Sequence, residues 1–433
     1  MSNIIAPTPQ RPGVSSVSSS SSVQLEDKMS NVNIASTFTT PALGGEIEMT
    51  RFDRKCHVET LLTSYVDTLT AATRPPSPLA SPLPTSPLAS GKHKVAIVGS
   101  GSWGTALAKI AAENIAARPD EFEPEVRMWV REKQVHGRNL TEVINTTHKN
   151  ERYLPDIKLP KNLVAVGQLK KVVEGASLIV FVVPHQFLHT VLFEFQTPGV
   201  ITPGARAVSA IKGVEVNGTD ISTFAALIEN KLDIPCSALS GANVALEVAR
   251  EQFCETTIGC PTHDDSLLWH AVFNAKKFQV QTVEDVSGVS LAGALKNVVA
   301  LAAGFVDGMK LGGNTKAAII RIGLKEMAEF TAEFFPGSQL STFTNESAGV
   351  ADLITTCTGG RNAKCAKDFI RTGRPWEAIE RDLLKGQKLQ GTATAEEVYN
   401  FLVTRKRTHA YPLFVQTYKV AFEGLAPDQL FEL

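Results

Sequence analysis

The feature that most restricts the possible folds is an apolar strand followed directly by a glycine-rich turn and a helix. Residues 94–98 show little polar alternation, which is typical of a buried strand, and a helical pattern begins at Trp103. Gly99, Gly101 and Gly104 stand at the spacing GxGxxG where the two meet. Glycines at these positions permit a tight turn and close backbone approach, and the helix N-terminus attracts a pyrophosphate. The segment therefore predicts a Rossmann-type domain that binds a dinucleotide.

Further strand candidates follow at the spacing expected when strands alternate with helices. They cover residues 125–130, 162–166, 178–183, 206–211, 235–240, 255–260 and 278–283. Helical patterns separate most of them, for example over 219–231 and 264–272. The run LIVFVV at 178–183 has no polar alternation, which favours a parallel sheet covered on both faces.

The pattern changes after about residue 285, because apolar residues then recur with helical period and no clear strand follows. We therefore expect a doubly wound α/β Rossmann-type domain over residues 93–285 and an all-α domain over 286–433. Residues 1–92 differ from both, since they contain Ser- and Pro-rich stretches that cannot bury a core, such as 74–90. We expect a disordered extension there, with an alternative of a short amphipathic helix at 55–73.

Composition excludes several classes of partner. The 433 residues contain 43 Lys and Arg against 44 Asp and Glu, a balance that favours neither nucleic acid nor a membrane surface. The six cysteines form no CxxC pair and no ligand-spaced set with histidine, which predicts free thiols and no metal site. No apolar core of a secretory signal is present, and acidic residues near the N-terminus are untypical of a mitochondrial presequence. The C-terminal tripeptide at 431–433 is not a peroxisomal SKL-type signal.

One charged residue, Lys296, interrupts the apolar segment 289–305. The segment is shorter than the roughly 20 residues of a membrane span, and a central lysine opposes insertion, so a buried helix of a soluble protein fits better. An unpaired buried ammonium is expensive, so the lysine has a partner, loses its proton or performs chemistry. The alternative is a lysine whose stem is buried while its head reaches water.

Two further places carry groups suited to a nicotinamide enzyme, in which the protein positions the substrate and moves a proton. Lys212 ends a predicted strand, where ligand-contacting groups of a doubly wound sheet emerge, although such a lysine is more often simply solvated. Arg361 and Asn362 follow Gly359-Gly360 and offer a planar guanidinium and an amide to a phosphate. A plain turn before a helix is the alternative there.

Several segments together resemble the eukaryotic type of NAD-dependent glycerol-3-phosphate dehydrogenase, from about residue 93 almost to the C-terminus. They are GSGSWG (99–104), FVVPHQF (181–187), IKG (211–213), GANVALEVA (241–249), CETTIGC (254–260), GALKNVVAL (293–301), ESAGVADLITTCTGGRN (346–362) and GQKLQG (386–391). The resemblance implies a homodimer that interconverts dihydroxyacetone phosphate and NADH with sn-glycerol 3-phosphate and NAD.

The resemblance also assigns roles to individual residues. Lys296 matches the catalytic lysine, a general acid and base, and Lys212 matches a substrate-contacting lysine that also lies near the cofactor and lowers the pKa of Lys296. Arg361 and Asn362 match the substrate-phosphate site, with Arg361 also near the cofactor. The residues that match the lining of the substrate site are Asn297, Asp352 and Thr356. Those that match NAD contacts are Gly99, Ser100, Gly101, Ser102, Trp103, Gly104, Phe187, Ala245, Lys388 and Gln390.

One departure from the family pattern bears on the cofactor. Arg131 stands where eukaryotic members usually carry an aromatic residue, and it can either stack on adenine or accept the 2′-phosphate of NADP. Glu132 beside it favours NAD, because its carboxylate would repel that phosphate. An NADP-tolerant enzyme of the same type therefore stays an alternative.

A related 2-hydroxyacid dehydrogenase is also compatible with these residues and, more remotely, so is a non-catalytic NADH-sensing module. The cytoplasm is the expected compartment, with a peroxisomal or mitochondrial fraction left open, as is the physiological direction of the reaction. The role of residues 1–92 is open too, including phosphorylation at Ser77, Ser81 and Ser86, each of which precedes a proline.

Overall fold

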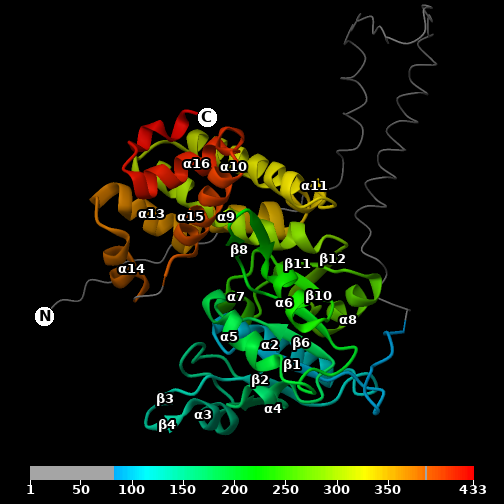
Figure 1. Ribbon diagram of the computed structural model, residues 1–433. Coiled ribbons are helices and arrows are strands. Elements are labelled where there is room, and N and C mark those ends of the chain that lie inside the picture. The colour runs from blue at the N-terminus through cyan, green and yellow to red at the C-terminus, as the bar shows by residue number, and fades with distance from the viewer. Residues whose placement is uncertain (1–81, 386–387) are drawn as a thin grey trace, which may run out of the picture. The chain divides into compact units, whose positions relative to one another are not determined.

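The computed structural model describes residues 82–385 and 388–433 of the chain (Figure 1). The sequence predictions for residues 1–81 lie outside the described residues. These are the disordered extension up to residue 81 of the 1–92 expected, the alternative helix at 55–73, and the Ser77 and Ser81 sites.

Eight strands form one sheet in the order β12-β11-β10-β7-β6-β1-β2-β5. The strands are β1 (Val95–Val98), β2 (Val126–Trp129), β5 (Leu163–Val166), β6 (Leu178–Phe181), β7 (Arg206–Ser209), β10 (Cys236–Ser240), β11 (Cys254–Gly259) and β12 (Phe278–Val283). Each falls within, or one residue from, a stretch whose pattern predicted a strand. The Rossmann-type expectation is confirmed.

One neighbouring pair departs from the expected parallel arrangement. Strands β10 and β11 are antiparallel, whereas all other neighbours in the sheet are parallel. A parallel pair needs a crossover that carries the chain back along the sheet, usually on a long helix. The connection after Ser240 contains only the five-residue helix α7 (Ala245–Ala249), which is too short to return the chain.

Helices cover both faces of the sheet, and successive residues of β1 show why its run is continuously apolar. Val95 and Ile97 belong to one core, whereas Ala96 and Val98 belong to another. The first core includes residues of α2 (Ser102–Ala116), α3 (Leu140–Thr147), α7 and α8 (His263–Phe273). The second includes residues of α4 (Leu169–Val173), α5 (Leu188–Phe195) and α6 (Phe224–Leu232). A strand buried on both faces has no place for polar alternation.

Two small hairpins interrupt this layered plan. They are β3 (Gln134–Val135) with β4 (Arg138–Asn139), and β8 (Val214–Asn217) with β9 (Asp220–Thr223). The helix predicted over 219–231 is therefore wrong in its first turn. Gly218 adopts φ +63° in the two-residue turn of the second hairpin, and helix α6 begins only after Thr223, whose side chain accepts a hydrogen bond from the Ala226 amide at 3.2 Å.

The chain beyond residue 285 is helical, as expected. Its elements are α9 (Val286–Gly308), α10 (Gly313–Phe334), α11 (Leu340–Thr344), the π-turn η2 (Ser347–Ala351), α12 (Asp352–Gly359), α13 (Arg361–Thr372), α14 (Trp376–Leu384), α15 (Gln390–Thr404), α16 (Pro412–Tyr418) and the π-turn η4 (Lys419–Glu423). Short 3₁₀ turns add η1 (His185–Phe187), η3 (Thr408–Ala410) and η5 (Pro427–Phe431).

Helix α9 is the centre of this helical region and lies where it meets the sheet (Figure 1). It packs against α10, α12, α13 and α15 and against the strands β10 and β11. Asp285 starts the helix by accepting a hydrogen bond from the Gly288 amide at 2.7 Å. By length and composition α9 could cross a membrane, but 94% of its apolar window is buried inside the protein. The helix is thus a core helix with Lys296 near its middle.

Residues 82–92, which composition assigns to the extension, contact the sheet region. The Pro84 carbonyl lies 2.9 Å from His93 Nε2, and the Ser86 hydroxyl donates to the Lys92 carbonyl at 2.8 Å. Leu83 packs against the core beneath α2 and α3. Ser86 is therefore engaged in the local structure of this segment.

Candidate functional site

The three glycines of the GxGxxG turn have three different surroundings. Gly99 has φ +132°, and a Cβ there would lie 2.7 Å from the Val182 carbonyl oxygen. A Cβ on Gly104 would lie 2.3 Å from the Gly99 carbonyl oxygen, so this glycine allows α2 to pack closely on the turn. A Cβ on Gly101 would meet no atom within 4 Å. The open position is the one at which a dinucleotide backbone would approach, so the turn fits that ligand.

These surroundings predict opposite results for two alanine substitutions. Gly101→Ala should leave stability close to wild type, because Gly101 has φ −64° and space for a methyl group, but should weaken NADH binding about tenfold by filling the approach. Gly104→Ala should instead destabilise the fold by about 1–3 kcal/mol. Thermal unfolding and NADH fluorescence titration measure the two effects. Unchanged NADH affinity in Gly101→Ala would contradict this placement of the cofactor.

A residue that sequence reasoning missed holds the turn in place. Asn150 is fully buried, and its amide nitrogen donates to the Ser100 carbonyl at 3.0 Å and to the Thr105 hydroxyl at 2.8 Å. The Ser102 hydroxyl donates to the Tyr153 carbonyl at 3.1 Å. The segment around Asn150 thus stabilises the glycine-rich turn through hydrogen bonds. No local pattern near Asn150 predicts these contacts.

Lys296, Asp352 and Lys212 form a buried ionic cluster. Lys296 is 4% exposed and its ammonium donates to Oδ1 of Asp352, which is 2% exposed. The Lys212 ammonium donates to Oδ2 of the same carboxylate at 2.8 Å. The alternative of a lysine with a solvated head is therefore wrong for Lys296. The structure brings together the two lysines that the sequence singled out, and Asp352 is their shared partner.

The surroundings of Lys296 change its acidity. Burial, and secondarily the nearby Lys212 charge, lower the pKa of Lys296 to about 7, although Asp352 acts in the opposite direction. For Asp352, burial alone would raise the pKa, but the two lysines outweigh it and hold the pKa of this carboxyl below its ordinary value. The cluster therefore combines an ionised carboxylate with an amine that can exchange its proton near neutral pH.

Close packing of β10 on α9 makes this arrangement possible. A Cβ on Gly293, one turn before Lys296, would lie 2.6 Å from Ser240 Oγ and 3.6 Å from Lys212 Cγ. Ser240 Oγ in turn lies 3.4 Å from Asp352 Oδ2. Sequence reasoning did not single out Gly293 or Ser240, although Gly293 stands in a segment that matches the family and Ser240 directly precedes another.

Asp352 reaches the cluster from an irregular helix junction. It is the first residue of α12, directly after the π-turn η2, a feature often found at functional sites. Thr356, one turn later, donates through its hydroxyl to the Asp352 carbonyl at 2.6 Å and lies 3.5 Å from Oδ1. Thr356 thus holds the start of α12 and lies beside the Asp352 carboxylate.

Asn297 and Asn362 join the lysine cluster to the start of α13. The amide nitrogen of Asn362 donates to Asn297 Oδ1 at 2.9 Å, and its own Oδ1 accepts from the Gly391 amide at 3.0 Å. Arg361 is the exposed first residue of α13, next to Asn362. After the Gly359-Gly360 turn, Arg361 and Asn362 are the first two residues of α13, and Asn362 contacts Asn297, the neighbour of Lys296.

The remaining predicted cofactor residues lie on turns or near the starts of helices. Phe187 is 41% exposed, and the Arg131 guanidinium carbon lies 5.3 Å from the centre of its ring. Ala245 is the first residue of α7. Gln390 Nε2 lies 3.4 Å from His185 Nδ1, which belongs to the sheet region. Trp103 packs against Phe278, with ring centres 6.2 Å apart.

Comparison with known proteins gives the family. The profile described as the NAD-dependent glycerol-3-phosphate dehydrogenase N-terminus matches residues 94–266, and that of the C-terminus matches residues 285–432. Glycerol-3-phosphate dehydrogenase [NAD(+)] 2 of Schizosaccharomyces pombe is 48% identical over 349 residues, which cover 78% of this chain and 92% of that protein. This chain belongs to the NAD-dependent glycerol-3-phosphate dehydrogenase family.

Two further relatives agree. The cytoplasmic glycerol-3-phosphate dehydrogenase [NAD(+)] of Drosophila kanekoi is 49% identical over 342 residues, covering 79% of this chain and 94% of that protein. The structure of glycerol-3-phosphate dehydrogenase from Saccharomyces cerevisiae matches with a TM-score of 0.75 and 43% identity, covering 79% of this chain and 99% of that one. The chain is thus an enzyme of this family, and NAD is its cofactor.

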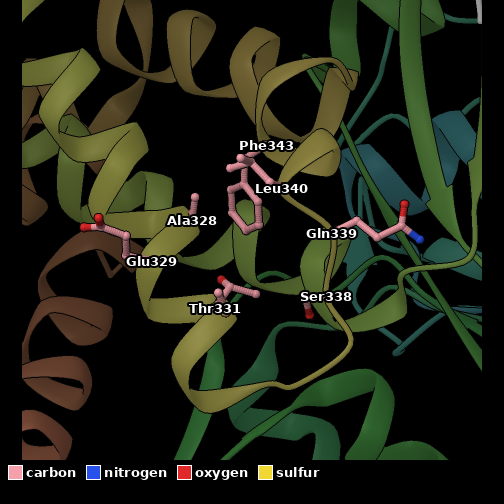
Figure 2. A pocket seen from close by; sticks show the side chains of 8 residues that line it. Ala328, Glu329, Thr331, Ser338, Gln339, Leu340 and Phe343 are labelled. Atoms are coloured by element: carbon pink, nitrogen blue, oxygen red, sulfur yellow. The ribbon is translucent and has the colours of Figure 1, made fainter. Parts of the chain in front are cut away.

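In the glycerol-3-phosphate dehydrogenase fold, one cavity lies away from the lysine cluster. It has a volume of about 270 Å³ and lies beside α10 and the loop that precedes α11 (Figure 2). Its lining consists of Ala328, Glu329, Thr331, Ala332, Ser338, Gln339, Leu340 and Phe343. No predicted site residue is among them, so this cavity is separate from the candidate active site.

No group of three His, Cys, Asp or Glu side chains suited to a metal ion occurs within residues 82–385 and 388–433 of this dehydrogenase. The cysteines of the described chain form no disulfide, and burial raises the pKa of the Cys236, Cys260 and Cys357 thiols. Thiols held neutral by burial are poor nucleophiles.

Proposed function

We propose that this enzyme interconverts dihydroxyacetone phosphate and NADH with sn-glycerol 3-phosphate and NAD, with Lys296 as general acid and base. The observation that carries the proposal is the ammonium of Lys296, buried on α9 with a pKa of about 7, beside a carboxylate that also contacts Lys212 and Ser240 of the sheet region. A proton donor works best when its pKa lies near the working pH. The cofactor supplies the hydride when bound.

Lys296 has a defined task in each direction. In reduction, its ammonium donates a proton to the carbonyl oxygen of dihydroxyacetone phosphate as negative charge develops there. In oxidation, the neutral amine takes the proton of the hydroxyl group. Lys212 lowers the pKa of Lys296, and Asp352 orients both ammonium groups through one oxygen each. At pH 7 both protonation states of Lys296 are populated, so one residue serves both directions.

The start of α13 is the proposed place for the substrate phosphate. The free amide groups of a helix N-terminus attract an anion, and Arg361 adds a guanidinium that can bind two phosphate oxygens at once. Asn362, Asn297 and Thr356 would line the same space. Asn362 donates to Asn297, the neighbour of Lys296, and Thr356 lies beside Asp352, which supports this proposal. The proposed cofactor contacts are Gly99, Ser100, Gly101, Ser102, Trp103, Gly104, Phe187, Lys212, Ala245, Arg361, Lys388 and Gln390.

Removal of Arg361 tests this assignment. Arg361→Ala should raise the KM for dihydroxyacetone phosphate about 100-fold, because two charge-assisted hydrogen bonds to a dianion are lost, while NADH binding changes less. Lys364→Ala, one turn further along α13 and also exposed, is the matched control and should stay near wild type. Steady-state kinetics measure both. Equal KM values in the two variants would contradict a phosphate site at Arg361.

The contact between Arg131 and Phe187 favours a second candidate, an NADP-tolerant enzyme of the same type. An arginine stacked on an aromatic ring at the end of β2 can cover an adenine, and its outer nitrogen atoms can also meet a 2′-phosphate. Glu132, next in the chain, opposes that phosphate and favours NAD. Oxidation of NADH and NADPH, followed side by side with dihydroxyacetone phosphate, decides between strict and relaxed cofactor use.

A cytoplasmic homodimer completes the proposal. Relatives from Drosophila kanekoi and Drosophila virilis carry the word cytoplasmic in their names, which supports this compartment for the present chain. The homodimer rests on the family resemblance. Light scattering after gel filtration tests the oligomeric state, and imaging the chain with and without residues 1–92 tests the compartment.

A further inference from the structure

Side chains from three different elements anchor the end of the loop before α15 (Lys388 and Leu389) and the first two residues of that helix (Gln390 and Gly391). Asn362 of α13 accepts a hydrogen bond from the Gly391 amide at 3.0 Å. His185 of η1 lies 3.4 Å from Gln390. Glu380 of α14 contacts the two remaining residues of the loop, Lys388 and Leu389. These anchors come from both the sheet region and the helical region, so the position of the loop depends on both.

Glu380 makes the most demanding of these contacts. It is only 5% exposed, and a buried carboxylate is costly unless its oxygen atoms have partners. One oxygen, Oε1, accepts from the Leu389 amide at 3.0 Å, and the other, Oε2, lies 2.9 Å from the Lys388 ammonium. Each oxygen thus has a separate partner in the loop.

Lys388 remains available to a ligand in this arrangement. Its side chain is 75% exposed, and its ammonium has three donors, of which Glu380 occupies one. The hydrogen bond and charge of Glu380 hold the pKa of Lys388 above its ordinary value, so the group is a permanent cation at neutral pH. A cation whose direction is set by a buried carboxylate is well suited to meet an anionic ligand.

We propose that Glu380 is a positioning residue for the dinucleotide: it sets the direction of the Lys388 ammonium and the path of the loop that carries Gln390. This inference rests on the proposed contact of Lys388 and Gln390 with the cofactor. Glu380 itself touches neither cofactor nor substrate. A residue with a merely structural role in packing α14 against the loop would change stability without changing NADH affinity.

Four single variants and one double variant of the full chain separate these roles. In Glu380→Gln the amide oxygen can still accept from the Leu389 amide, but the ion pair with Lys388 is lost, whereas Glu380→Ala loses both contacts. Lys388→Met removes the cation and keeps the length of the side chain. Glu377→Gln, an exposed glutamate on the same helix, is the matched control. NADH affinity is measured by fluorescence titration, KM and kcat by steady-state assay, and folding by thermal unfolding.

We expect Glu380→Gln to weaken NADH binding about three- to fivefold with little change in kcat, because the lost ion pair has one exposed partner. Glu380→Ala should weaken it about tenfold or more, since a buried amide loses its acceptor. Glu377→Gln should match wild type. The double variant Glu380→Gln, Lys388→Met should bind NADH no more weakly than Lys388→Met alone, because Glu380 acts through Lys388.

The results that overturn this inference differ from those that overturn the cofactor contact. If Lys388→Met weakens NADH binding while Glu380→Gln binds NADH like wild type, Glu380 has no positioning role. A lower unfolding temperature of Glu380→Gln with unchanged NADH affinity leads to the same conclusion. If Lys388→Met itself binds NADH like wild type, the proposed cofactor contact of the loop fails, and the inference fails with it.

Discussion

Lys296→Met should lower turnover with dihydroxyacetone phosphate by about 100- to 10,000-fold, the usual contribution of a positioned general acid. Methionine fills most of the space of the buried lysine stem, and Asp352 keeps Lys212 as its partner. NADH binding should stay close to wild type, because the turn at Gly99–Gly104 is unchanged. Steady-state kinetics and NADH titration of the same preparation measure both effects.

The pH dependence of the wild-type enzyme tests the acid and base role of Lys296 independently. Reduction needs the protonated Lys296, so its kcat should fall as pH rises through about 7. Oxidation of glycerol 3-phosphate needs the neutral amine, so its kcat should rise over the same interval. The residual activity of Lys296→Met should lose both dependences.

A matched control is Lys316→Met on α10. Lys316 is a partly buried lysine whose ammonium lies 2.8 Å from Asp307 Oδ2, and it is not part of the Lys296–Asp352–Lys212 cluster. Turnover of this variant should stay close to that of the wild type. Near-normal turnover of Lys296→Met, or the same pH profile with and without the lysine, would remove Lys296 from the mechanism.

Asp352→Asn should lower both turnover and stability, which distinguishes it from the lysine substitution. The asparagine keeps the shape of the side chain but leaves Lys296 and Lys212 facing each other without a carboxylate between them. Removing one partner from a buried ionic cluster costs about 3–5 kcal/mol of folding free energy. Loss of the negative charge also lowers the pKa of Lys296 further, so at pH 7 less of the acid form is available for reduction.

Asp285→Asn is the control for a purely structural loss. Asp285 is also buried, and its carboxylate caps α9 at Gly288 and accepts from the Thr342 hydroxyl at 2.6 Å. Its substitution should lower the unfolding temperature while the kcat of the folded enzyme stays near wild type. Denaturant unfolding and kcat, measured for both variants, test the contrast. An Asp352→Asn enzyme with normal kcat would show that the cluster serves stability alone.

Local patterns in the chain were sufficient to predict most of the architecture. The eight strands of the sheet appear in the sequence as runs of apolar or β-branched residues, because each strand is buried on one or both faces. The helical region is marked by the change to helical period after residue 285. The glycine-rich turn was predictable for the same kind of reason: the surroundings of Gly99, Gly101 and Gly104 are set by their immediate neighbours and by one adjacent strand.

Where local and tertiary effects compete, the predictions were weaker. The first turn of the helix expected at 219–231 is a strand, because the turn at Gly218 pairs it with the preceding strand. The antiparallel direction of β11 follows from how little helix the connection from β10 contains. Neither feature changes the hydrophobic pattern of the segment itself, which is what the prediction used.

The candidate site divides in the same way. The sequence by itself identified Lys296 as an anomalous charge in an apolar helix and offered Lys212, Arg361 and Asn362 as candidate ligand contacts, and the family resemblance supplied Asp352. The tertiary structure decided that one carboxylate serves two lysines, 56 and 140 residues away in the chain. It also decided that Asn150 braces the turn and that Glu380 holds Lys388. Such contacts join residues that are distant in sequence, and no periodicity or local propensity encodes them; the acidity of Lys296 exists only once folding has removed water from around it.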